Sequence, residues 1–245
     1  MFFFFRKPTV TIDAFVRDEY AFANEYAPID KASKFLPQWF RELETLNKKT
    51  VLSKPNFNFS QNVKSCPGIF NSLSKGFIVP LWCDFFLQWD MEKLSVKFSD
   101  NLTSIKSHNP AQLGNFTNNH WIFKIESPWY LKFSKPTKLI FMPLDYHLGI
   151  DYHIKTAYGI QNTNTSLNIL QTHQFCFLER SPTARKEITN FRTPIVHFIP
   201  FDDYDYKIKC HVDSKEVSKI FSLSGYPTSF FSRFLKTSLI EKNKK

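Results

Sequence analysis

Two carboxylate and imidazole pairs lie close together in the sequence, as Asp145-Tyr-His147 and Asp151-Tyr-His153 on either side of Gly149. Histidine nitrogens and aspartate oxygens are common ligands of transition metals, so His147, Asp151 and His153 could hold a metal ion across a turn. The spacing matches no specific metal-binding motif. We therefore favour a polar, aromatic loop at the rim of a β core, in which Asp145 and His147 contact a ligand.

Four further polar residues are candidates for ligand contacts. His108 and Gln112 are four positions apart, so on a helix they would share a face and could orient one ligand. Purely local structure is the plainer interpretation of that pair. Asn162 and Asn164 end the segment Gly159-Ile-Gln-Asn-Thr-Asn164, and their amides can bind a ligand but cannot act as a general base.

Signatures of a catalytic site are missing or incomplete. His211-Val-Asp213 resembles the first two ligands of an iron and 2-oxoglutarate oxygenase, but no histidine follows His211 to supply the third. The chain also lacks a Gly-x-Ser-x-Gly elbow and a glycine-rich phosphate loop. We expect no cofactor, and these patterns favour a protein without enzymatic activity.

The candidate residues depend on a mainly β fold to position them. Residues 121–201 have the pattern of short antiparallel strands, which predicts a β-clip or barrel-like core with peripheral N- and C-terminal helices. We divide the chain into an N-terminal strand and helical arm (1–63), a β-rich core domain (64–212) and C-terminal helices packed on that core (213–245).

Individual elements follow from hydrophobic periodicity. Alternation predicts a first strand at 9–16, a hairpin of 85–89 with 94–98, and a last strand at 204–212. Apolar residues at three- and four-residue steps predict a helix from Asp30 to about Leu46, with Pro37 in its first turn.

Three further helices are expected. One spans 67–74 and is followed by Gly76, and two close the chain, at 214–223 and from Thr228 onward. The apolar stripe of the last helix must be buried against the core or another chain.

The formal net charge is +10, but the basic residues are scattered, so nucleic-acid binding is possible without being favoured.

The four cysteines form no Cys-x-x-Cys pair, which favours free thiols in a reducing compartment. No segment has the roughly 18 to 20 apolar residues of a membrane span. The 28 Phe against 6 Gly fit A/T-rich codons, which predicts a phage or bacterial gene and a protein in the host cytoplasm or virion.

Most of the chain, from about 28 to 201, resembles an uncharacterised family of phage and bacterial proteins known only as a domain of unknown function. The resemblance implies no activity. It rests on Cys66-Pro-Gly-Ile-Phe70, Gly76-Phe-Ile-Val-Pro-Leu-Trp-Cys-Asp84, His108, Gln112, Ser127-Pro-Trp129, Gly159-Ile160, Thr193-Pro-Ile195 and Ile199-Pro-Phe201.

A second resemblance concerns the order of three motifs, at 139–143, 159–164 and 193–199, which is similar to that of trimeric deoxyuridine triphosphatases. That family has a β-clip fold, an Asp in the middle motif that engages the deoxyribose and the attacking water, and Arg and Ser that bind the phosphates. Here Asn162 and Asn164 stand where carboxylates are expected, and Leu144-Asp145 stand where Arg-Ser is expected. The resemblance therefore implies the scaffold without the nucleotide-hydrolysing chemistry.

Together these observations predict a non-enzymatic binding or structural protein of phage type. Its β-clip-like scaffold would engage a protein partner or a neighbouring subunit, with self-association through the C-terminal helices and no membrane contact. The alternative is an enzyme that processes a small molecule or nucleotide with a His/Asp site in the β core.

Overall fold

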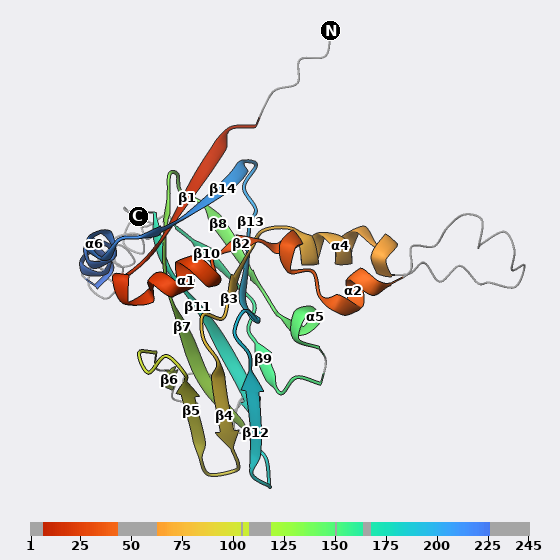
Figure 1. Cartoon of the computed structure of the whole chain (residues 1–245). Helices are drawn as coiled ribbons and strands as arrows, with labels where there is room; N and C mark the ends of the chain where they lie inside the picture. The colour runs from red at the N-terminus through yellow and green to blue at the C-terminus, as the bar shows by residue number, and fades with distance from the viewer. Residues whose placement is uncertain are drawn as a thin grey trace, which may run out of the picture.

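The computed structural model describes residues 7–43, 63–103, 105–107, 119–149, 151–163 and 168–225. The fold is mainly β, as the sequence predicts, and its strands form three sheets. None of these sheets closes into a barrel within the described ranges, so the barrel-like closure that we expected is not seen. Figure 1 shows the strands in the centre, with α2, α4 and α5 on one side and α6 on the other.

The largest sheet, sheet A, is built around a long antiparallel pair, β7 (His120–Phe133) and β11 (Ile169–Glu179). The strand β1 (Thr9–Val16) lies between β7 and β14 (Asp205–Val212) and runs parallel to β14. Two short strands, β9 (Ile154–Thr156) and β6 (Ile105–Ser107), add to β11 and β7. The alternating burial of β1 confirms the predicted first strand.

Sheet B and sheet C are smaller and wholly antiparallel. Sheet B has the order β10-β8-β13-β3-β2, and sheet C has the order β12-β4-β5. The pair β4 and β5 confirms the predicted hairpin. The strands of these two sheets are β2 (Asp30–Lys31), β3 (Phe77–Pro80), β4 (Phe85–Trp89), β5 (Leu94–Phe98), β8 (Lys138–Met142), β10 (Gly159–Asn162), β12 (Arg185–Thr189) and β13 (Pro194–Pro200).

One hydrophobic core joins all three sheets. Sheet A contributes Phe123 and Trp129, sheet B contributes Phe198, and sheet C contributes Phe85 and Trp89, and all five side chains are buried in the same cluster. Burial of aromatic side chains of this size is the main favourable contribution to folding. Of the candidate residues, Asp145 lies at the start of α5 and Asn162 at the end of β10, both exposed and outside this core.

The predicted helix over 30–46 is wrong as a single element. Its described part consists of β2, the 3-10 turn η2 (Ala32–Phe35) and the short helix α2 (Gln38–Glu42). Pro37 disfavours helical backbone at the residue before it, and Leu36 accordingly has an extended ψ of 127°. Ala32 and Phe35 of η2 pack with Ile78 of β3, so this part of the arm covers sheet B, while Phe40 is buried beside Phe70 of α4.

The other described helices are short, apart from two that the sequence predicts. These two are α4 (Pro67–Ser74) and α6 (Ser214–Gly225), and the second predicted C-terminal helix lies outside the described residues. Within the described ranges no helix is long and apolar enough to cross a membrane. The remaining helical segments are η1 (Asp18–Tyr20), α1 (Ala21–Tyr26), η3 (Val63–Ser65) and α5 (Asp145–Leu148).

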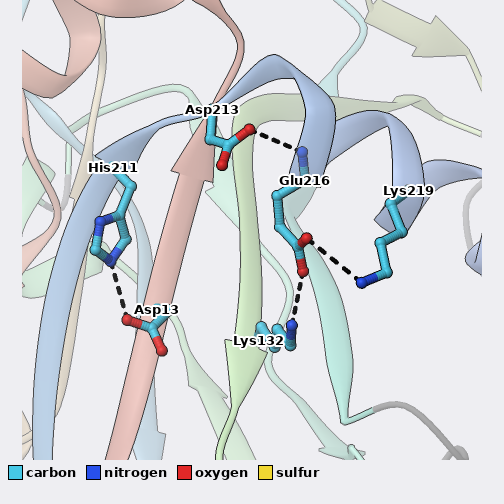
Figure 2. A network of polar contacts seen from close by, with 6 residues as sticks. All are labelled: Asp13, Lys132, His211, Asp213, Glu216 and Lys219. Atoms are coloured by element: carbon cyan, nitrogen blue, oxygen red, sulfur yellow. Dashed lines mark hydrogen bonds and ion pairs between the residues drawn. The ribbon is translucent and has the colours of Figure 1, made fainter.

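Polar contacts fix α6 to sheet A (Figure 2). Val217 and Ile220 of α6 are buried, and Glu216 accepts a 2.6 Å hydrogen bond from Lys132 of β7. Asp213 caps the helix, because its Oδ1 accepts from the backbone N–H groups of Lys215 and Glu216 at 3.0 and 2.9 Å. The predicted C-terminal helix at this position is confirmed.

Asp213→Ala should lower the free energy of unfolding by about 1 kcal/mol, because two N–H groups of the first turn of α6 lose their acceptor. Urea denaturation measures this loss. Asp203→Ala is the matched control, since it removes an exposed ion pair with Lys7 that contributes little. Equal losses in the two variants would show that the cap does not stabilise α6.

Candidate functional site

The structure distributes the predicted site residues over separate places. Asp145 is exposed at the start of α5 and lies 3.7 Å from Lys155. Asn162 is exposed at the end of β10, opposite Lys138. His108, Gln112 and Asn164 lie outside the described residues. The ligand contacts proposed for these three residues therefore remain predictions.

His147 packs against a second histidine that the sequence analysis did not single out. The rings of His147 and His197 have centroids 5.5 Å apart at an interplanar angle of 80°. His197 Nε2 donates to the Lys75 carbonyl oxygen at 2.8 Å, while both ring nitrogens of His147 are buried without a partner among the described residues. Burial, with the nearby His197, lowers the pKa of His147 to about 4, and burial lowers the pKa of His197.

Asp151 and His153 line a cavity with a volume of about 390 Å³. The cavity lies where β4 and β11 end and where β7 and β12 begin, beside the loop that precedes β9. Trp89, Tyr152 and Phe177 supply aromatic surface, and apart from Pro182 the other lining residues are polar or charged. The complete lining consists of Trp89, His120, Asp151, Tyr152, His153, Lys155, Phe177, Glu179, Arg180, Ser181, Pro182 and Arg185.

A chain of hydrogen bonds fixes His153 at this cavity. Nδ1 of His153 lies 2.8 Å from Oε2 of Glu187, and Nε2 lies 2.6 Å from Nη1 of Arg185. Because a guanidinium can only donate, Nε2 is the acceptor, and the proton is assigned to Nδ1. Arg185 Nε also donates to Ser181 Oγ at 3.1 Å. Both ring nitrogens of His153 are thus occupied, so neither is free to take a proton from a substrate.

Two other residues shape the cavity. Arg180 Nη1 donates to the Met91 carbonyl oxygen at 3.0 Å, and its guanidinium lies 4.1 Å from the centre of the Trp121 ring. Tyr152 is hydrogen-bonded to Thr189, and burial raises the pKa of the Tyr152 hydroxyl well above its usual range. The Tyr152 hydroxyl therefore stays protonated and neutral.

The structure gives no support to the metal alternative. Across the described part of the chain, no group of three or more His, Cys, Asp or Glu side chains could hold a metal ion. His147 and His153 belong to different clusters, because His147 packs on His197 and His153 bonds to Glu187 and Arg185.

The four cysteines are free thiols. Burial raises the pKa of Cys83 and of Cys210 to about 12, and it raises the pKa of the buried Cys176 as well. A thiol with a raised pKa is a poor nucleophile at neutral pH. Cys83, Cys176 and Cys210 therefore do not fit a catalytic role.

Sequence reasoning missed Arg180 and Arg185, which line the cavity, and Glu187, which is hydrogen-bonded to His153. One signal was present: Arg185 and Glu187 are two positions apart in a strand, which places them on the same face. Nothing local indicated that this face would meet His153, which is more than 30 residues away in sequence.

No protein-family model, curated protein or solved structure matches the chain. The resemblances to the phage and bacterial family and to the deoxyuridine triphosphatases therefore stay predictions.

Proposed function

We propose that the protein is a non-enzymatic binding or structural protein of phage type, whose β-rich scaffold pairs with a second copy of the same chain. The observation that carries this proposal is the edge strand β10, which has the exposed apolar side chain Ile160 and no charged residue. Such a strand lacks the features by which soluble proteins prevent pairing between sheet edges.

The other edge strands of the described sheets differ from β10 in carrying basic residues. Among the described sheets, β10 is the edge strand without a Lys or Arg residue. A lysine or arginine on an edge strand disfavours edge-to-edge pairing, because it would bring like charges together or lose its hydration. The other edge strands carry Lys31 in β2, Lys97 in β5, Lys106 in β6, Lys155 in β9, Arg185 and Lys186 in β12, and Lys207 and Lys209 in β14.

Exposed apolar surface lies on and beside β10. Ile160 is 73% exposed, and Tyr158, which directly precedes the strand, is 82% exposed. They border a cleft of about 160 Å³ that Phe141 and Phe175 also line. Two-fold antiparallel pairing of β10 with its copy would extend sheet B across the interface and cover both side chains.

The sequence analysis predicts self-association through the C-terminal helices, whereas we now favour the edge of β10. Of those helices the structure describes α6, which buries Val217 and Ile220 within its own chain. Those two side chains are therefore not available to a neighbouring subunit, and β10 is the surface that we favour.

Ile160→Lys should convert a dimer into a monomer, because two-fold pairing would bring a charge on each β10 close to its copy. Light scattering coupled to size-exclusion chromatography, over a concentration series, measures the change. Ile188→Lys is the matched control, since Ile188 is 58% exposed on an edge strand that already carries charge. A wild-type protein that stays monomeric throughout, or a dimer that Ile160→Lys leaves intact, would contradict the proposal.

The second candidate is an enzyme acting on a small molecule or nucleotide at the cavity. The observation in its favour is the pair of Glu187 and His153, which has the carboxylate and imidazole arrangement of a general base. Arg185 occupies the nitrogen that such a base would use, so this alternative requires Arg185 to move away first. The binding function needs no such change.

A further inference from the structure

We infer that the cavity beside His153 binds a small organic acid, whose carboxylate is held by Arg185 and whose apolar part lies against Tyr152 and Phe177. This site is independent of the β10 edge. The inference rests on the bonding of two arginines, on the size of the cavity and on the charges around it.

Arg185 is oriented but incompletely bonded. Of the five N–H groups of its guanidinium, one donates to His153 Nε2 at 2.6 Å and one to Ser181 Oγ at 3.1 Å. Because His153 is itself held by Glu187, the guanidinium has a fixed direction. The remaining N–H groups have no acceptor within the described ranges. A planar guanidinium held in this way can bind a carboxylate through two parallel hydrogen bonds.

Arg180 supplies a second positive charge to the same lining. Its Nε is buried without a hydrogen-bond partner among the residues that the structure describes. Neither Arg180 nor Arg185 forms an ion pair with a carboxylate of that part of the chain. Lys132 of β7, by contrast, is paired with Glu216. The Arg180 guanidinium therefore adds positive charge beside the site, which favours an anion over a neutral ligand.

The acidic residues of the lining limit the charge of the ligand. Asp151 and Glu179 face the same cavity, and Lys155 is near Asp145 as well. A polyphosphate would meet both carboxylates at short range, whereas a single carboxylate can lie on the arginine side. The lining therefore favours a monoanion over a nucleotide.

The dimensions agree with a small molecule. A volume of about 390 Å³ lies near the lower end of the range for ligand sites, which is roughly 300 to 1,000 Å³. The half-buried rings of Tyr152 and Phe177 can cover an apolar body while its carboxylate faces Arg185. We take benzoate as the simplest compound with both parts.

The test compares benzoate with benzamide, which has nearly the same shape and no charge. Trp89 and Trp121 lie at or beside the cavity, so their fluorescence should report binding, with calorimetry as a second measurement. We expect benzoate to bind with a millimolar Kd and benzamide at least about tenfold more weakly, since hydrogen bonds to charged groups are the strong ones.

Variants assign the effect to Arg185. Arg185→Gln should weaken benzoate binding about tenfold or more and leave benzamide unchanged, while Arg185→Lys, which keeps the charge without the planar fork, should fall between. Lys186→Gln is the matched control, because it removes a neighbouring positive charge that does not line the cavity. Circular dichroism establishes that each variant is folded.

Three results would overturn the inference. These are equal binding of benzoate and benzamide, equal benzoate binding by the wild type and Arg185→Gln, and no benzoate binding up to roughly 10 mM. Loss of benzoate binding in Lys186→Gln as well would point to general surface charge and would also overturn it.

Discussion

Gly76→Ala is expected to lower the free energy of unfolding by about 3 kcal/mol or more. Gly76 joins α4 to β3 with a φ of +81°, which side chains other than glycine rarely adopt. A Cβ there would lie 2.3 Å from the Phe198 carbonyl oxygen and 2.9 Å from Ile199 Cα. Both atoms belong to the backbone of β13, so sheet B itself would have to move.

Two other glycines separate the causes of this loss. Gly149 has a φ of +94° but no atom within 4 Å of a Cβ, so Gly149→Ala measures backbone strain alone. Gly159 has neither the strained backbone nor a close neighbour, so Gly159→Ala should change stability little. Thermal and urea denaturation should show the largest loss of stability for Gly76→Ala, a smaller loss for Gly149→Ala and the smallest for Gly159→Ala. A Gly76→Ala variant no less stable than Gly149→Ala would rule out the clash.

Acid is expected to destabilise the protein through His147 and His197. Burial lowers the pKa of His147 from 6.5 to about 4 in the folded state, so protons bind the unfolded chain first as the pH falls. The free energy of unfolding keeps its full value above about pH 6.5 and falls progressively between pH 6.5 and 4. Protonation of His147 alone accounts for a loss of up to about 3 kcal/mol, and protonation of His197 acts in the same direction.

His147→Leu tests this assignment. The variant removes the titrating ring and two buried nitrogens without partners, so its stability should depend much less on pH between 6.5 and 4. Denaturation curves at several pH values measure the difference. His120→Gln, which removes a histidine outside the pair, should keep the wild-type dependence. If His147→Leu also keeps it, His147 is not the group responsible.

Strands and helices with a clear local pattern could be predicted from the sequence. The alternation in 9–16 and the hairpin of β4 and β5 survive in the fold because each strand has one face in the core. The helix over 30–46 is interrupted, because Pro37 disfavours helical backbone at Leu36, which has an extended ψ of 127°. The steric restriction that Pro37 places on Leu36 therefore outweighed the helical periodicity of the apolar residues.

The candidate site was predictable only in part. The repeated triplets indicated Asp151 and His153, which do line the cavity. Asp145 and His147 separate because they lie two residues apart in the helix α5, where such side chains point in different directions. Arg185 and Glu187 reach His153 through the pairing of β12 with β4, and non-local contacts of this kind leave no local signal.

The parallel pair of β1 and β14 has a consequence for how the chain folds during synthesis. All eight residues of β1 pair with β14, while only Ile12 to Phe15 pair with β7. Since Val16 pairs with Val212, the pairing of β1 with β14 cannot be completed until residue 212 has left the ribosome. Loop closure over this distance is slow, so β1 should be among the last strands to become protected from hydrogen exchange.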